Sequence, residues 1–294
     1  MPSFAWKSAI RRCRVLIACL CGLAAGAAQA QGYPARPIRL IINYAPGGPT
    51  DLAARIVAPH LGAALGQQII IDNRPGAGGT VGMGILAKSN PDGHTLTLSA
   101  NGEVGIAPNL YAKLSYDPLR DIVPISRIGA SQLLLVVHPA VSAASVKELL
   151  ALAGARPGSV NFASAGTGST AHLPGELFRT LANVHIVHVP YKGAGPAMTD
   201  LMGGQVQMLI TGVSAAMPHV KAGKLRALAS TGGRRLGVWP ELPTIGETIA
   251  GYEVNSWYGV LAPAGTPPAV ISRLSAELIR LVRRGDVNER LNGA

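Results

Sequence analysis

The sequence has 294 residues and a formal net charge of +11, and hydrophobic residues make up 48% of it. A chain of this length can bury a large core and form more than one lobe. Its basic residues are scattered and aromatic residues amount to only 4%, which argues against a nucleic-acid-binding protein.

The N-terminal segment, residues 1–30, has the composition of a cleaved export signal. Basic residues fall between positions 7 and 14, an apolar run follows at 15–25, and Ala28-Gln29-Ala30 forms a small-x-small cleavage site. The apolar run is too short to span a bilayer, which takes about 20 residues. We therefore predict export to the periplasm, with cleavage after Ala30.

Two rival export signals fit this segment less well. Cys19 ends a possible lipoprotein box, but few apolar residues separate it from Arg14, and Arg11-Arg12 lacks the apolar residue expected after a twin-arginine pair. All 3 cysteines of the chain lie in this segment. The exported chain would therefore need no disulfide and would offer no thiol nucleophile or thiolate metal ligand.

The exported chain begins with a strand–turn–helix unit. Residues 38–42 form an apolar, β-branched run typical of a buried strand, and apolar residues at helical spacing follow the turn. Gly47 and Gly48 allow a sharp turn that leaves backbone amides bare, and Thr50 or Asp51 can cap the helix. The unit predicts an anion site at the helix N-terminus; the alternative is a tight turn without a ligand.

Two further strands are expected at 68–72 and 95–99, with a glycine turn at 73–80 and a helix through Ala87 between them. Strands that alternate with helices favour a parallel sheet covered on both faces. In such sheets ligands bind beyond the carboxyl ends of the strands, where these turns lie.

A second strand–turn–helix unit is predicted in the middle of the chain. A strand at 159–164 leads into the polar glycine turn 165–170, and a helix is expected at 171–182. Another glycine turn lies at 190–196. The remaining expected elements are strands at 133–137, 184–189, 205–210, 225–229 and 257–261 and helices at 145–153, around 198–201 and at 271–282. The repeated unit predicts two similar α/β lobes joined by a hinge, with a ligand cleft between them.

Other chemistries fit the residues less well. Gly166-x-Gly168-x-x-Ala171 matches a dinucleotide fingerprint, but the acidic residue expected about 20 positions later is missing. His185 and His188 lie on opposite faces of a strand and make a poor metal pair. His172 is either a ligand contact or a packing residue. No paired carboxylates lie in a glycine turn, so acid–base catalysis has no evident candidates.

Several motifs, spread in order over the exported chain, together resemble one known family. They include Tyr33-Pro34-x-Arg36-Pro37-Ile38, Ala45-Pro46-Gly47-Gly48-x-Thr50-Asp51, Asp72-Asn73-Arg74-Pro75-Gly76-Ala77-Gly78-Gly79, Phe162-Ala163-Ser164-Ala165-Gly166, His188-Val189-Pro190-Tyr191-Lys192-Gly193 and Leu261-Ala262-Pro263-Ala264-Gly265-Thr266-Pro267. In these motifs the chain is similar to the Bug family of extracytoplasmic solute receptors, the binding proteins of tripartite tricarboxylate transporters.

The resemblance implies a two-lobed α/β fold of the type II periplasmic binding proteins, with mainly parallel sheets, helices on both faces and a hinge between the lobes. Lobe one would comprise residues 31–127 and 231–294, and lobe two residues 128–230. The resemblance also implies a monomer that captures a small carboxylate and delivers it to membrane transporter subunits. It implies no enzymatic activity, cofactor or metal.

The resemblance and the two predicted units together indicate the ligand contacts. The expected contacts are Tyr44, Gly47, Gly48, Thr50 and Asp51 from lobe one and Ser164, Gly166, Thr167, Gly168, Ser169, His172, Tyr191 and Gly193 from lobe two. We expect Asp51 to cap the helix or to hold water rather than to touch a carboxylate directly, because like charges repel.

The chain departs from the family pattern at three places. Pro49 stands where the family usually has glycine or a small polar residue, and proline removes one amide from the first turn. Many members carry Asp or Asn near Thr211-Gly212, so their ligand specificity cannot be transferred to this chain. The sequence also ends before the position where members usually end, and the usual last segment would add a turn and a long helix to lobe one.

Two other functions remain open from the sequence. A ligand sensor for a signalling protein would use the same fold, and a dinucleotide-dependent enzyme would rest on the fingerprint at Gly166–Ala171. Titration with nicotinamide and adenine cofactors would identify the enzyme, and neighbouring genes would distinguish the transporter from the sensor.

Overall fold

The computed structural model describes residues 32–292, so the predicted signal segment, residues 1–30, lies outside the described residues. Residues 32–35 carry no helix or strand. Of the described residues, 36–292 belong to one compact unit, which holds every element named below. Between residues 32 and 292, no helix has both the length and the apolar character needed to cross a membrane.

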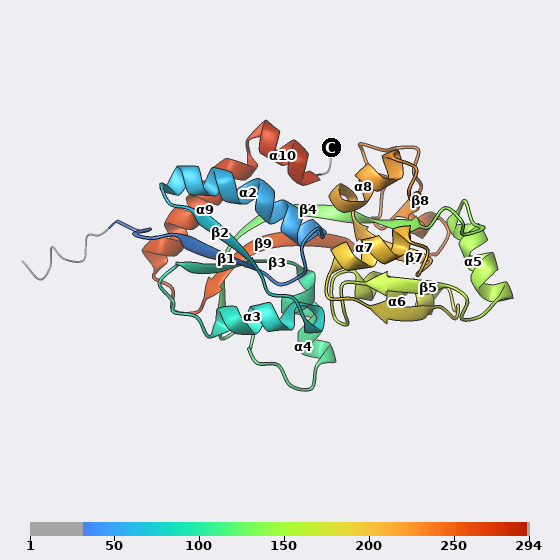
Figure 1. The fold of residues 1–294 in the computed structure, drawn as a ribbon, viewed down its shortest axis with the longest axis horizontal. Coiled ribbons are helices and arrows are strands. Elements are labelled where there is room, and N and C mark those ends of the chain that lie inside the picture. Colours follow the sequence, from blue (N-terminus) through green and yellow to red (C-terminus); the bar gives the residue numbers. More distant parts are fainter. Residues whose placement is uncertain (1–31, 293–294) are drawn as a thin grey trace, which may run out of the picture. The chain divides into compact units, whose positions relative to one another are not determined.

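Within the described residues, the strands form one 9-stranded sheet in the order β2-β1-β3-β9-β4-β7-β5-β6, and β8 pairs with β4 off this path (Figure 1). The strands are β1 (Ile38–Ile42), β2 (Ile69–Asn73), β3 (Thr95–Ser99), β4 (Ile122–Val137), β5 (Asn161–Ser164), β6 (Val187–Pro190), β7 (Met208–Gly212), β8 (Arg226–Ser230) and β9 (Asn255–Pro263). β1 is parallel to β2 and β3, and β5 is parallel to β6 and β7.

The long strands β4 and β9 join the two parallel regions of the sheet. From Ile122 to Gln132, β4 pairs antiparallel with β9, and its last residues pair antiparallel with β7 and β8. The register of the β4–β9 pair shifts at two places, between residues 124 and 126 and between residues 127 and 129. The sheet is therefore mixed, with its parallel pairs in the two regions where the sequence predicted strand–turn–helix units.

Helices cover the sheet on both faces. The helices are α2 (Pro49–Leu65), α3 (Thr80–Ala87), α4 (Ala107–Leu110), α5 (Val146–Ala155), α6 (His172–Leu181), α7 (Ala194–Met202), α8 (Val213–Lys221), α9 (Pro268–Val282) and α10 (Gly285–Asn292), with short turns of helix η1 (Ala77–Gly79), η2 (Gly102–Ile106) and η3 (Ile245–Glu247). Figure 1 shows α2 and α9 on one side of β1 and β3, and α3 on the other.

The end of β4 shows how alternating side chains build both faces. Leu133 and Leu135 belong to an apolar cluster that includes Leu149 of α5 and residues of α6. Leu134 and Val136 belong to a second cluster, with residues of α7 and α8. Because successive strand residues point to opposite faces, one continuous apolar run supports helices on both sides of the sheet.

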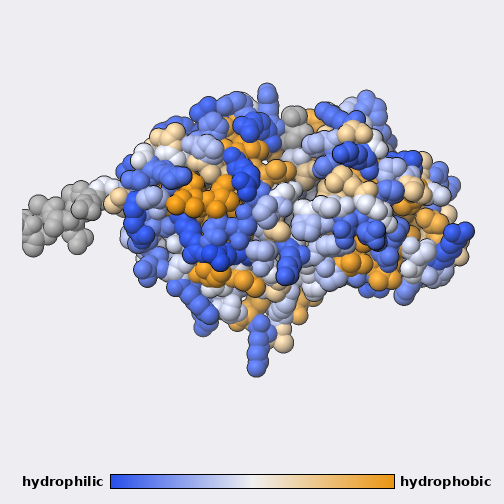
Figure 2. Space-filling model, viewed as in Figure 1, coloured by the Kyte–Doolittle hydropathy of each residue, from blue (hydrophilic) through white to orange (hydrophobic). Residues whose placement is uncertain are grey.

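β2 is an edge strand of the sheet. Ile70 is 47% exposed, while Asp72 on the same strand accepts hydrogen bonds from Arg39 and Arg74. Charged side chains on an edge strand discourage pairing with another chain. On the face shown in Figure 2, hydrophobic residues form separate patches among hydrophilic ones.

The α/β prediction is confirmed, and both strand–turn–helix units are present. β1 and β3 have the predicted bounds. The strand predicted at 133–137 is only the end of β4. β4 begins at Ile122, because residues 122–132 pair with β9 through a ladder that has two register shifts. Helix α8 was not predicted.

Candidate functional site

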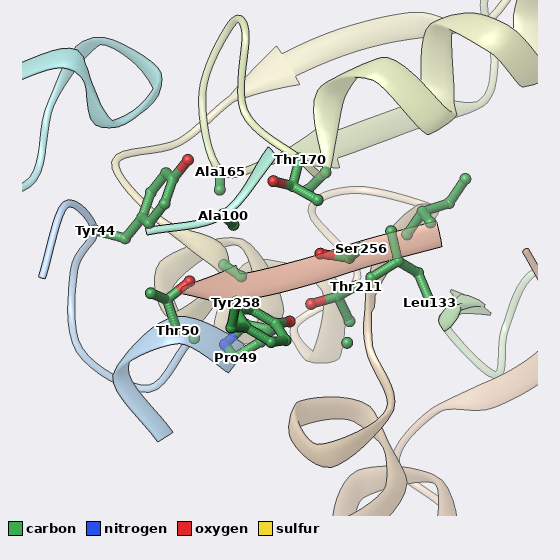
Figure 3. A pocket seen from close by; sticks show the side chains of 15 residues that line it. Tyr44, Pro49, Thr50, Ala100, Leu133, Ala165, Thr170, Thr211, Ser256 and Tyr258 are labelled. Atoms are coloured by element: carbon green, nitrogen blue, oxygen red, sulfur yellow. The ribbon is translucent and has the colours of Figure 1, made fainter. Parts of the chain in front are cut away.

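A small cavity lies beyond the carboxyl ends of β1, β3, β5 and β7 (Figure 3). Its volume is about 40 Å³. The residues that line it are Tyr44, Gly48, Pro49, Thr50, Ala100, Leu133, Ala165, Thr170, Ala171, Ala194, Ile210, Thr211, Gly212, Ser256 and Tyr258. All of these side chains are uncharged, so whatever the cavity holds is met by dipoles and apolar groups.

The N-terminal ends of α2, α6, α7 and α8 border this cavity. Gly48, Ala171 and Gly212 immediately precede α2, α6 and α8, and Ala194 is the first residue of α7. The first amides of a helix lack intrahelical partners and carry a partial positive charge. Several helix ends around a space without charged side chains favour a small anion.

Hydroxyl side chains on β7 and β9 face the same space. In Figure 3 the oxygens of Thr211 and Ser256 lie near each other at the cavity. Thr211 is 2% exposed, and its Oγ1 has no hydrogen-bond partner among the described residues. Burial raises the pKa of Tyr258 to about 12, so this hydroxyl keeps its proton at neutral pH. Such groups can donate hydrogen bonds to a carboxylate.

Turns from distant parts of the chain meet beside the cavity. The backbone amide of Gly102 donates to Thr170 Oγ1 at 3.2 Å, and the amide of Ala45 donates to the Lys192 carbonyl at 3.1 Å. Two glycines permit equally close approaches. A Cβ on Gly195 would collide with the carbonyl of Pro46, and a Cβ on Gly78 would collide with the carbonyl of Thr167. The turns beside the cavity therefore touch one another backbone to backbone.

Asp51 holds the turn between β1 and α2 in place by hydrogen bonds. Its carboxylate accepts hydrogen bonds from the amide of Gly47 at 3.0 Å, from Arg55 at 2.9 Å and from Asn73 at 3.0 Å. Burial alone would raise the pKa of Asp51, but these hydrogen bonds outweigh it and lower the pKa. Asp51 therefore stays ionised and fixes the turn, and it does not line the cavity.

A pair of histidines braces the second turn. His188 Nε2 lies 2.6 Å from Ser164 Oγ, which also accepts from the amide of Gly166. His172 Nδ1 accepts from the amide of Gly168 at 3.2 Å, and the two rings are in contact, tilted by 39° with centroids 4.3 Å apart. This arrangement holds the turn that carries the cavity residues between β5 and α6.

The same histidines and Glu176 are a group of the described residues that could hold a metal ion, with ligand atoms within 4.8 Å of one another. His172 Nε2 lies 3.7 Å from a carboxylate oxygen of Glu176. However, a ring nitrogen of each histidine is already hydrogen-bonded to the β5–α6 segment, His188 Nε2 to Ser164 and His172 Nδ1 to Gly168. The geometry therefore favours a structural role for the two histidines, in holding the turn between β5 and α6, over coordination of a metal ion.

We expect the free energy of unfolding to decrease as the pH falls from about 6.5 to 4. Burial, and then the neighbouring His172, lowers the pKa of His188 to about 4, whereas the unfolded residue takes up its proton near pH 6.5. The unfolded state thus binds more protons in this window, and by pH 5 the loss is at most about 2 kcal/mol.

Urea denaturation between pH 7 and pH 5 would measure this loss. In His188→Asn the free energy of unfolding should change less between pH 7 and pH 5. The titrating ring is gone in this variant, while a hydrogen-bonding side chain remains opposite Ser164. His219→Asn, which changes a histidine on α8, is the control and should leave the slope unchanged. The same slope in both variants would contradict the assignment to His188.

A buried carboxylate supports the ends of β1 and β3 behind the cavity. Glu103 is 0% exposed and accepts hydrogen bonds from Asn43 at 3.1 Å, from Ser99 at 3.0 Å and from the amide of Ala100 at 3.3 Å. Burial raises the pKa of Glu103, and burial followed by the charge of Glu103 raises the pKa of Tyr44. Ala100 and Tyr44 line the cavity, so Glu103 positions part of its wall.

The structure places the predicted contacts in three groups. Tyr44, Gly48 and Thr50 line the cavity. Those that pack in or beside the contacting turns without lining it are Gly47, Asp51, Ser164, Gly166, Thr167, Gly168, Ser169, His172 and Gly193. Tyr191 donates to Asp200 at 2.7 Å and lines a separate outer groove of about 460 Å³, together with Gly166 and Thr167.

A family profile described as "Tripartite tricarboxylate transporter family receptor" matches residues 53–292. The chain belongs to this family. Protein BugT of Bordetella pertussis is 41% identical over 251 residues, which cover 85% of this chain and 77% of BugT. The Bug family resemblance found in the sequence motifs is therefore confirmed.

Solved structures agree in fold with this member of the receptor family. The periplasmic binding protein BugD superposes with a TM-score of 0.85 at 32% identity and covers 89% of this chain and 87% of its own. MatC from Rhodopseudomonas palustris, solved with bound malate, superposes with a TM-score of 0.84 at 33% identity and covers 88% of both chains. The predicted two-lobed periplasmic binding fold is confirmed, and the relatives are receptors rather than enzymes.

Most lining residues of this receptor were not among the predicted contacts. Ala165 and Thr170 lie within the second predicted turn, and Ala194 follows the predicted Gly193, so the turns pointed to them. Thr211, in β7, lies at one of the places where the sequence was expected to depart from the family pattern. In contrast, Ser256 comes from the interior of β9, where no turn or motif marks a ligand contact.

Proposed function

We propose that this chain is a periplasmic receptor that captures a small carboxylate in the cavity and delivers it to a tripartite tricarboxylate-type membrane transporter. The observation that carries the proposal is the convergence of the N-terminal ends of α2, α6, α7 and α8 on a space lined by uncharged residues. The unpaired hydroxyl of Thr211 adds a donor. MatC, a relative, binds malate, which is a carboxylate.

In this proposal the cavity is the cleft between two lobes, seen in a closed arrangement. Lobe one comprises residues 31–127 and 231–294 and lobe two comprises residues 128–230, so β4 and β9 link them. A ligand that contacts both lobes stabilises the closed state by population shift. The contacts of Gly102 with Thr170 and of Ala45 with Lys192 support this reading, since each joins the two proposed lobes.

Hydrogen bonds supply most of the proposed affinity. Each helix end stabilises an anion by about 0.3–1 kcal/mol when exposed and by up to about 2 kcal/mol when partly buried. A hydrogen bond to a charged group contributes about 1.5–3 kcal/mol. Several such bonds offset the cost of taking a carboxylate out of water without requiring an arginine or lysine partner.

Gly48→Val is expected to weaken carboxylate binding by at least about tenfold, equivalent to ~1.4 kcal/mol. A Cβ at Gly48 would lie 3.3 Å from the Ala194 Cβ and 3.5 Å from the Ala194 amide, so the valine methyls would cover the α7 end and fill the cavity. Isothermal titration with a panel of mono-, di- and tricarboxylates checks this. Gly154→Val on α5 is the control, because a Cβ there meets open space far from the cavity-lining residues.

The same panel should include nicotinamide and adenine cofactors. Saturable binding of a cofactor with no response to any carboxylate would overturn the receptor proposal in favour of a dinucleotide-binding protein. Equal carboxylate affinity in wild type and Gly48→Val would mean that the ligand binds outside this cavity.

A further inference from the structure

We propose that His172 positions the turn 165–170 against the proposed lobe one, and that it does so only as a neutral hydrogen-bond acceptor, so that acidification weakens ligand capture. This inference rests on the proposed function, because it adds a proton-sensitive step to the same site. Two observations carry it: the hydrogen bond that the His172 ring accepts from this turn, and the contacts that the turn makes with the proposed lobe one.

The ring of His172 holds the turn through one specific nitrogen. His172 Nδ1 lies 3.2 Å from the backbone nitrogen of Gly168, whose N–H donates to it. A ring nitrogen that accepts a hydrogen bond carries no proton, so the proton of the neutral ring lies on Nε2. Nε2 lies 3.7 Å from a carboxylate oxygen of Glu176. The hydrogen bond from Gly168 therefore exists only while His172 is neutral.

The same turn touches the proposed lobe one through backbone and side chains. Tyr111 donates its hydroxyl to the Thr167 carbonyl at 2.9 Å, and the amide of Gly102 donates to Thr170 Oγ1 at 3.2 Å. A Cβ on Gly168 would lie 3.1 Å from the ring of Tyr111, so this ring packs directly on the turn. Thr170 also lines the cavity. The position of the turn thus decides both the contact between the lobes and part of the cavity wall.

Among the described residues, two ionisable side chains face this histidine ring. His188 on β6 is in contact with it, with ring centroids 4.3 Å apart, and Glu176 lies one helical turn along α6. Arg179 pairs with Glu176 at 2.8 Å, which reduces the charge that Glu176 presents to the ring. β5 and β7, which also pack against α6, have no charged residue. Tyr252 reaches α6 as a neutral donor to the Pro174 carbonyl, because burial raises its pKa.

These surroundings disfavour a protonated ring in the closed arrangement. Burial lowers the pKa of His172, and the opposing effect of Glu176 does not outweigh it. A proton on Nδ1 would face the N–H of Gly168, so that two donors meet, and it would place a charge beside His188.

The open state tolerates the proton better. There the turn no longer has lobe one against it, so it can move away from a protonated ring, which takes up its proton near pH 6.5. The closed state therefore binds fewer protons than the open state. As the pH falls through this value, the population shifts toward the open state and the affinity for the ligand decreases.

Isothermal titration of the whole exported chain with malate and with adipate, at pH 7 and at pH 5.5, tests the inference. His172→Asn is the reference, since asparagine keeps an acceptor oxygen close to the Nδ1 position and does not titrate. We expect the wild type to lose at least about threefold more affinity than His172→Asn between the two pH values. One group with an open-state pKa of about 6.5 sets a limit of roughly eightfold. Equal losses in both proteins would overturn the inference.

Two more variants make the test specific. His172→Leu removes the acceptor and should weaken binding about fivefold at pH 7, whereas His172→Asn should stay within about twofold of the wild type. His138→Asn is the matched control, because His138 Nδ1 also accepts from a backbone amide, that of Ala140 at 3.2 Å, at an exposed position that does not line the cavity. It should follow the wild type at both pH values. Equal binding by His172→Leu and His172→Asn would contradict the positioning role.

A second measurement needs no ligand. At one pH, the amide hydrogen of Gly168 should exchange with solvent faster in His172→Leu than in His172→Asn, since only leucine leaves this amide without its acceptor. Equal exchange in the two variants would overturn the inference and leave the proposed function standing. No binding of any carboxylate would overturn the proposed function, and the exchange of Gly168 would still decide whether His172 holds the turn.

Discussion

Gly195→Ala is expected to weaken carboxylate binding by about tenfold to a hundredfold. Gly195 lies in the first turn of α7, where alanine is well tolerated by a helix, but its Cβ would collide with the backbone carbonyl of Pro46. A backbone atom cannot rotate away as a side chain can, so the turn that precedes α2 has to withdraw from α7. Overpacking of this kind typically costs 1–3 kcal/mol, and the cost falls on the closed cavity.

The matched control is Gly203→Ala, at the other end of the same helix. A Cβ at Gly203 would meet its nearest atom, the carbonyl oxygen of Thr199, at 3.5 Å, which is an ordinary contact. Titration with the best carboxylate of the panel should separate the two variants, while their melting temperatures without ligand should remain similar. Wild-type affinity in Gly195→Ala would show that the contact between Pro46 and α7 is not needed for binding.

Glu103→Ala is expected to lower the free energy of unfolding by about 3–5 kcal/mol. The substitution leaves the buried donors of Asn43, Ser99 and Ala100 without their acceptor, and each unsatisfied buried group costs about 1–3 kcal/mol. In a chain of this size such a loss lowers the melting temperature by roughly 10 °C. Urea denaturation and thermal melts both measure it.

Two variants make this result specific. Glu103→Gln keeps the shape and one acceptor oxygen, so it should lose less than half as much stability as Glu103→Ala. Glu241→Ala removes a carboxylate from an exposed position and should change stability by no more than about 0.5 kcal/mol. If Glu103→Ala melts with the wild type, the carboxylate does not support the strands behind the cavity.

The parts of the fold that the sequence revealed are those with strong local signals. The strands 38–42 and 95–99 have alternating or β-branched apolar residues and are bounded by glycine turns, and both were predicted at their observed bounds. The glycine turns themselves were located correctly because glycine and proline mark them regardless of tertiary context.

The parts that the sequence concealed depend on tertiary partners. The first part of β4 contains Pro124 and Gly129, which argue locally against a strand, yet β9 pairs along it through two register shifts. Helix α8 contains Pro218 and small residues with little periodic signal, and it forms where its apolar side packs against the β4–β7 region. In both cases packing outweighs local propensity.

The candidate site also has parts that could be predicted from the sequence and parts that could not. The sequence identified the turns that surround the cavity, because bare amides and glycines belong to the turns themselves. It could not show which turn residues face the cavity and which face the opposing turn: Gly166 and Thr167 pack against η1, and Tyr111 donates to the Thr167 carbonyl, while their neighbour Ala165 lines the cavity. It also could not identify Leu133 and Ser256, which reach the cavity from strands that meet only in the folded sheet.

The pairing of β4 with β9 has a mechanical consequence. If the two regions of the sheet change their angle, this hydrogen-bonded ribbon has to flex, and the two register shifts between Pro124 and Gly129 are where its ladder yields most easily. Flexing stores elastic energy, which adds to or subtracts from the energy of ligand capture. In the proposed receptor, the stiffness of residues 122–132 would therefore contribute to the affinity for a carboxylate, and substitutions in this ribbon would change that affinity while every cavity-lining residue stays the same.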